Sequence, residues 1–195
     1  VSVVQEFATY GPNDEPVPVL ATAIRERGLA GKRLGLEMSS WFFSVALYRQ
    51  LLQALPGSTV VDGSGVVETL RPYKSEAEID YIRRGAHAAN VAMQAAFETA
   101  VPGNSENDVA GAIYQAGIKA GCEFPGSPPY VNAGPRVLLP HASWDDRPIE
   151  QGDQVYVELS GCICRYSAAL MRTWSLGPAD ARLLRLEEAI NAGLD

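Results

Sequence analysis

The sequence predicts an α+β fold in two parts. Residues 1–66 alternate helical patterns with short runs of β-branched residues, which is typical of an α/β layer. From residue 75 onward, two long helical patterns precede segments in which apolar residues recur at every second position, a period that indicates β-strands. A chain of 195 residues can form one large domain, or a small domain and part of another.

The first part is predicted to contain two helices and two strands. In order, these are a helix at 17–28, a strand at 32–37, a helix at 41–55 and a strand at 58–61. Ser39 or Ser40 is the predicted N-cap of the second helix, because a serine hydroxyl can accept a hydrogen bond from the first turn. Pro56 and Gly57 are predicted to end that helix.

The second part opens with two capping boxes. Ser75 is followed three residues later by Glu78, which predicts the start of a long helix that runs to about Val101. Ser105 and Asp108 repeat the pattern for a helix over residues 106–120. Each box provides side-chain partners for two backbone N–H groups that the helix itself would leave unpaired.

A hairpin of two strands is predicted next. One face of the first strand carries Val155, Val157 and Leu159, and the other face carries Tyr156, Glu158 and Ser160. A turn over residues 161–165 leads to a return strand over 167–174, and a final helix is predicted over 179–194.

Composition and charge narrow the classes of partner. The net charge of −7 argues against nucleic acid and anionic membranes, because both favour basic surfaces. No apolar run approaches the roughly 18 residues that a membrane span needs, and the first residues lack the basic and apolar pattern of a signal peptide, so we expect none. Three cysteines, an odd number, do not indicate a disulfide framework. We therefore expect a cytoplasmic protein with a small-molecule substrate.

One stretch, residues 140–177, places three polar residues in an informative order. His141 lies 17 residues before Glu158, and a second strand follows that carries Arg172 and Thr173. This order resembles the first half of the active site in the creatinase, Xaa-Pro peptidase and methionine aminopeptidase superfamily, which has the pita-bread fold.

The resemblance also divides the chain. Residues 71–79, Arg-Pro-Tyr-Lys-Ser-Glu-Ala-Glu-Ile, resemble the joint between the two domains of this superfamily. The resemblance implies a partial creatinase-like N-terminal domain of α/β type at 1–68, followed by the N-terminal half of a pita-bread catalytic domain at 69–195. Because the superfamily's later histidine-glycine motif and two glutamates are missing from the sequence, we expect the chain to be truncated. We also expect it to be inactive alone and prone to associate, and the complete protein to be a homodimer.

Ala169 departs from the metal-binding pattern. In metal-binding members the second strand has the pattern Tyr-x-x-Asp-x-Thr-Arg-Thr, and here Ala169 replaces the aspartate between Tyr166 and Thr173. A two-metal hydrolase needs bridging carboxylates, and alanine has no ligand atom. The resemblance therefore implies no metal and no other cofactor; the alternative is a divalent metal such as Mn or Zn.

Three residues are candidates for the site. The resemblance implies that His141 is catalytic, and a histidine titrates near neutral pH, although a surface loop histidine is the alternative. Glu158 occupies the place of the first metal-binding aspartate and is expected to bind substrate; alternatively, its strand face is simply exposed to solvent. Arg172 could bind a substrate carboxylate or order Glu158, or it could form a structural ion pair.

The expected function is hydrolysis of a non-peptide C–N bond in a small cationic amidine or guanidino compound, without metal, as in creatinase or ectoine hydrolase. Without metal ions, Glu158 leaves a negative pocket that should favour a cation over a neutral peptide. The first alternative is a metal-dependent Xaa-Pro dipeptidase or aminopeptidase. The second alternative is a catalytically inactive pita-bread domain that serves as a binding module.

Overall fold

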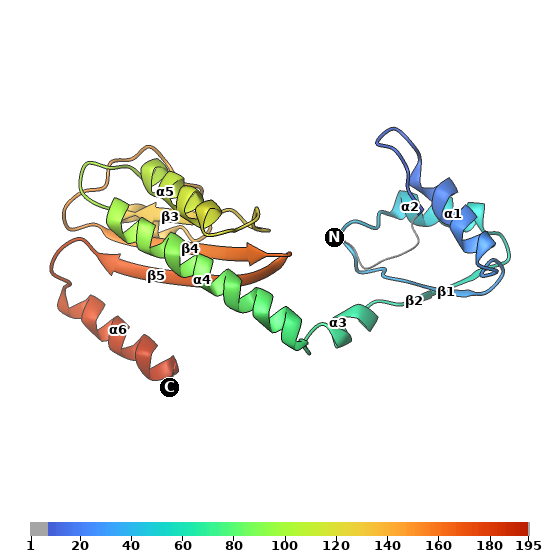
Figure 1. The fold of residues 1–195 in the computed structure, drawn as a ribbon. Coiled ribbons are helices and arrows are strands. Elements are labelled where there is room, and N and C mark those ends of the chain that lie inside the picture. The colour runs from blue at the N-terminus through green and yellow to red at the C-terminus, as the bar shows by residue number, and fades with distance from the viewer. Residues whose placement is uncertain (1–7, 195) are drawn as a thin grey trace. The chain divides into compact units, whose positions relative to one another are not determined.

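The computed structural model describes residues 8–194, and the chain divides after Tyr73 into two compact units (Figure 1). Helices and strands contribute to both units, so the predicted α+β class is confirmed. The predicted domain boundary at residue 68 falls inside a short helix, α3 (Val66–Leu70), that we did not predict. Among the described residues, no helix is both long enough and apolar enough to cross a membrane.

The first unit is a small α/β layer. Its other elements are α1 (Pro16–Glu26), β1 (Arg33–Leu36), α2 (Val45–Ala54) and β2 (Thr59–Asp62), with the two strands parallel. The predicted cap of α2 was wrong, because Ser44 is the N-cap and accepts a hydrogen bond of 3.2 Å from the N–H of Leu47. The earlier serines belong to turns instead: Ser40 donates its N–H to Glu37 and accepts from Phe43.

Two helices with the predicted capping boxes begin the second unit. In α4 (Glu76–Thr99), the N–H of Ser75 donates to Oε2 of Glu78 at 2.6 Å. In α5 (Glu106–Lys119), the N–H of Ser105 donates to Oδ2 of Asp108 at 2.7 Å. Both boxes are confirmed, since the side chain of each serine also accepts from the backbone of its partner.

The second unit also contains a three-stranded antiparallel sheet in the order β3-β4-β5. The predicted hairpin is present, and a third strand, β3, and a 3-10 helix, η1, precede it. The bounds are β3 (Tyr130–Ala133), η1 (Gly134–Leu138), β4 (Gln154–Ile163) and β5 (Tyr166–Ser175), and the last helix is α6 (Ala181–Leu194).

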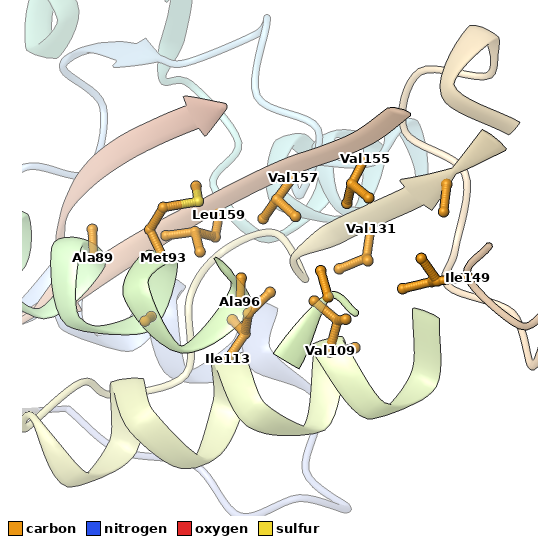
Figure 2. Close-up of a cluster of buried hydrophobic side chains, with 14 residues drawn as sticks. Ala89, Met93, Ala96, Val109, Ile113, Val131, Ile149, Val155, Val157 and Leu159 are labelled. Carbon is orange, nitrogen blue, oxygen red and sulfur yellow. The ribbon is translucent and has the colours of Figure 1, made fainter. Parts of the chain in front are cut away.

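The core lies between the sheet and the pair α4 and α5 (Figure 2). Side chains of Val131, Val155 and Val157 point from the strands toward Met93 and Ile113 on the helices. The period-two pattern of β4 is therefore real: Val155, Val157 and Leu159 are buried, and the alternate residues belong to the second face of the sheet.

Two glycines allow α4 to cross β4 closely. A methyl group added to Gly161 would overlap the carbonyl oxygen of Gly85, and one added to Gly85 would lie 2.9 Å from the carbonyl oxygen of Gly161. Neither position tolerates a side chain without movement of one element. This contact fixes the helix layer on one face of the sheet, and the candidate site lies on the other.

Candidate active site

The second face of the sheet gathers polar and aromatic side chains from two strands. In the β3–β4 pairing, Tyr130 lies opposite Glu158 and Asn132 lies opposite Tyr156. Directly opposite residues of antiparallel strands project to the same face, so these four side chains share the face that the helices leave uncovered. The arrangement follows from the alternation of β4, whose other face is the apolar core.

Glu158 is the centre of this group. Its side chain is 21% exposed, and its Oε2 lies 3.4 Å from Nε2 of His141. The same oxygen accepts a 2.5 Å hydrogen bond from the hydroxyl of Tyr156. The structure therefore brings together two of the three predicted site residues, His141 and Glu158, and adds a phenol that the sequence analysis assigned no role.

His141 is held over the face by an aromatic neighbour. Its ring stacks on Tyr130, with centroids 4.6 Å apart and planes inclined by 26°. Its backbone has a φ of 61°, in the left-handed region that residues other than glycine seldom adopt. The side chain remains 63% exposed, so the imidazole can exchange protons with solvent or with a ligand.

Tyr156 is a phenol whose proton is firmly held. Burial, together with its hydrogen bond to Glu158 and the charge of that carboxylate, raises the pKa of Tyr156 to about 12. The phenol therefore stays protonated and remains a donor to Glu158 throughout the neutral pH range. Tyr156 is one of the site residues that sequence inspection missed, although its position two residues before Glu158 puts it on the same strand face.

Ala169 and Arg172 lie on different faces of β5. Ala169 pairs with Ser160, on the face of Glu158, whereas Arg172 pairs with Val157, whose side chain is in the core. Nη1 of Arg172 donates to the carbonyl oxygen of Met171 at 2.6 Å. The alternative in which Arg172 orders Glu158 is therefore wrong, because the sheet separates the two side chains. A role for Arg172 in substrate binding stays a prediction.

The side chains on this face offer few donor atoms for a metal ion. Glu158 and His141 supply ligand atoms there, whereas Ala169, a diagonal neighbour of Glu158, has none. Among residues 8–194, no group of three or more histidine, cysteine, aspartate or glutamate side chains could hold a metal ion. The donor set of the described residues does not fit a two-metal centre.

Two more residues near the site escaped the sequence analysis. Glu106, the first residue of α5, is fully buried and binds Arg136, on the loop that leads to His141. An acidic residue at the start of a helix is usually exposed, so the sequence did not indicate that Glu106 would be buried. Asn132 is also fully buried, and neither polar atom of its amide bonds to any part of the described chain.

The fold and the site together define a class. A small α/β unit is followed by two helices on an antiparallel sheet whose free face carries an acid and a histidine, as the sequence resemblance implied. Residues 80–195 match metallopeptidase family M24, and residues 3–73 match the creatinase/prolidase N-terminal domain. The chain belongs to metallopeptidase family M24, so the predicted superfamily is confirmed.

Individual relatives agree with this assignment. The chain is 29% identical over 194 residues to ectoine hydrolase of Halomonas elongata, a match that covers 94% of this chain and 49% of that protein. It is 30% identical over 125 residues to Xaa-Pro dipeptidase of Pyrococcus horikoshii, with 64% of this chain and 36% of that protein covered. The chain thus spans about half the length of the first relative and less of the second.

A solved structure supports the same fold. The Xaa-Pro dipeptidase from Bacillus anthracis superimposes with a TM-score of 0.77 at 25% identity, over 89% of this chain and 47% of that one. The match extends over most of both units, so the fold class rests on more than the catalytic motif.

Proposed function

We propose that this chain forms part of a metal-independent hydrolase that opens a non-peptide C–N bond in a small cationic amidine or guanidino compound. The observation that carries the proposal is the contact between His141 and Glu158, 3.4 Å apart on a face where Ala169 supplies no second carboxylate. The match to an ectoine hydrolase over 94% of the chain supports the same choice of substrate class.

The charge on this face supports the proposed preference for a cation. The Glu158 carboxylate is partly buried, at 21% exposure, which strengthens its field relative to a carboxylate in open water. A planar amidinium or guanidinium presents paired N–H donors that match a carboxylate. Tyr156 keeps its proton and donates to Oε2 of Glu158, which leaves the acid oriented for a cationic ligand.

His141 would supply the proton that the reaction needs. Water adds its oxygen to the central carbon of the substrate and the C–N bond breaks. The departing nitrogen takes a proton from the imidazolium, and the proton released by the water restores the imidazolium. An exposed histidine beside a carboxylate suits this step, because imidazole is the side chain that most often transfers protons in enzymes and a substrate can reach the exposed ring.

A second candidate is a metal-dependent Xaa-Pro dipeptidase. The specific observation in its favour is the 30% identity to the Pyrococcus horikoshii dipeptidase over 125 residues. Ala169 does not favour it, since a two-metal centre depends on bridging carboxylates and this position beside Glu158 supplies none.

Turnover by the gene product that carries this chain tests the two candidates. The assay would use ectoine, creatine and an Xaa-Pro dipeptide, each with and without a chelator. We expect hydrolysis of a cationic substrate that persists in the chelator. Turnover of the dipeptide alone, abolished by the chelator, would support the dipeptidase instead. Absence of turnover with every substrate would favour the catalytically inactive binding module.

A further inference from the structure

The loop that carries His141 is closed by a single guanidinium. It leaves β3 at Gly134, and Arg136 lies in its first turn. Nε of Arg136 donates to both oxygens of Glu106 at 3.1 Å, and Oε1 of Glu106 also accepts from the N–H of Ala133 at 2.8 Å. A buried carboxylate at the start of α5 thus anchors the point at which the loop leaves the sheet.

The other end of the same guanidinium reaches across the loop. Nη2 of Arg136 donates to the carbonyl oxygen of Ser143 at 2.6 Å, and Nη1 lies 3.3 Å from Oδ2 of Asp145. Residues 136, 143 and 145 are therefore tied together, and His141 lies on the segment between them. Because the guanidinium is planar, its five donors hold fixed directions, so these contacts constrain the loop geometry as well as its closure.

The backbone of His141 gives an independent reason to look for such a restraint. Its φ of 61° is unfavourable for a residue with a Cβ, and such a conformation persists only when the surrounding structure enforces it. Stacking on Tyr130 and the contact with Glu158 act on the ring. Arg136 acts on the backbone instead: it donates to the carbonyl oxygen of Ser143 after His141, and its partner Glu106 accepts from the N–H of Ala133 before it.

We propose that Arg136 is a positioning residue for His141: bound to the buried Glu106, it closes the loop so that the imidazole lies against Tyr130 and Glu158. The inference rests on the catalytic role proposed for His141, but its geometric part holds for the chain whether or not that role is correct. Arg136 itself does not touch the reacting atoms; it acts through the loop.

We call the contacts of Arg136 with Glu106, Ser143 and Asp145 the clamp. Three changes to the clamp test this proposal in the full chain. Glu106→Gln with Arg136→Met removes the ion pair without leaving a buried charge, and the glutamine can still accept from Ala133. Asp145→Asn weakens only the contact across the loop. Arg136→Lys keeps the charge but cannot make all the contacts at once. Arg84→Met is the matched control, because Arg84 forms an exposed pair with Asp80 at 4.0 Å on α4.

The first readout is the NMR spectrum of the histidine rings. The sequence has two histidines, and His87, exposed on α4, is the internal reference for an intact fold. Stacking on Tyr130 displaces the ring-proton shifts of His141. We expect the Glu106→Gln/Arg136→Met variant to move the His141 signals toward those of an unstructured histidine, with His87 and the core signals unchanged. Asp145→Asn and Arg136→Lys should produce smaller shifts in the same direction.

The second readout is turnover by the gene product. A misplacement of about 1 Å can cost about 10²-fold in rate, so kcat should fall by up to that factor in the double variant, with KM little changed and partial rescue in Arg136→Lys. Unchanged His141 signals in Asp145→Asn and Arg136→Lys would overturn the inference, even if the double variant did not fold. Displaced His141 signals with unchanged kcat would support the positioning role of Arg136 and refute the catalytic role proposed for His141. Absence of all activity in the wild type would instead refute the proposed function, and the NMR result would still test the clamp.

Discussion

Tyr156 donates its hydroxyl hydrogen to Oε2 of Glu158 over 2.5 Å, and both side chains project from the same face of β4. The donor and acceptor are two residues apart, so the extended strand alone brings them together. Burial and the carboxylate raise the pKa of Tyr156 to about 12, which keeps this hydrogen in place at any pH near neutrality.

The first prediction concerns this hydrogen bond. Tyr156→Phe should lower the free energy of unfolding by about 1–2 kcal/mol, since a bond to a charged acceptor is lost in a partly buried place. Urea unfolding measures the change, and Tyr73→Phe, at a side chain that is exposed, is the control. An alkaline absorbance titration should also lack one tyrosine that titrates near pH 12 in the wild type. A variant as stable as the wild type would contradict the assigned bond.

The second prediction concerns the crossing of α4 and β4. Gly161→Ala would place a methyl group against the carbonyl oxygen of Gly85, so it should destabilise the second unit by about 3 kcal/mol or more. Gly111→Ala is the matched control: it lies within α5 with open space around it, and should stabilise by up to about 1 kcal/mol through helix propensity. Thermal unfolding of both variants measures the difference, and equal melting temperatures would mean that the crossing is looser than described.

Local chemistry explains which elements the sequence could predict. The capping boxes at Ser75 and Ser105 depend on residues three positions apart, and both were predicted correctly. The buried side of β4 was visible because its apolar residues alternate. In contrast, β3 is four residues long and follows two prolines, so it carries too little periodicity to be recognised.

The side of the sheet on which Arg172 lies could not be predicted, because it depends on the turn. The β4–β5 turn consists of Cys164 and Arg165, which adopt positive φ values of 49° and 65° without being glycine or asparagine. Glu123 stabilises them by accepting from both N–H groups, at 3.0 and 3.3 Å. A contact from 41 residues away thus sets the register, and the register puts Arg172 opposite Val157.

In the candidate site, too, some residues could be predicted from the sequence and others could not. Order and spacing suggested His141 and Glu158 through a family resemblance, and the structure brings them together. Nothing in the spacing indicated that Arg136 would span the loop that carries His141, since its partners come from α5 and from the far side of that loop. Long-range contacts of polar side chains leave no periodic signal in a single sequence.

The third prediction concerns pH. Hydrogen bonds from Tyr166 and then from Ser75 lower the pKa of Glu78 from 4.5 to about 2. An acid with a lowered pKa adds stability above its unfolded value, and that stability is lost as the pH falls through the folded value. Tyr166→Phe should therefore lower the melting temperature most above pH 4.5, and the gap from the wild type should close as the pH approaches 2. A gap that stayed constant from pH 7 to pH 2 would rule out this linkage.

The fourth prediction concerns metal content. The purified protein should contain less than one equivalent of Mn, Co, Zn or Fe, because Ala169 offers no ligand beside Glu158. Ala169→Asp should increase the affinity for Mn²⁺ in calorimetric titrations, whereas the uncharged Ala169→Asn should change it much less. Two ions per chain in the wild type, with turnover lost to a chelator, would refute the metal-independent mechanism.

The fifth prediction separates the roles of the two central side chains. In the gene product that carries this chain, His141→Ala should lower kcat by roughly 10²–10⁴-fold with little change in KM, because proton delivery to the departing nitrogen occurs in the transition state. Glu158→Gln is nearly isosteric but uncharged, so it should chiefly raise KM for a cationic substrate. His87→Ala, at an exposed position on α4, is the control and should leave both parameters unchanged. Steady-state kinetics on ectoine, creatine and an Xaa-Pro dipeptide measure all three variants. A His141→Ala protein with the wild-type kcat would remove His141 from the mechanism, because no other histidine of this chain lies beside Glu158 in the part that the structure describes.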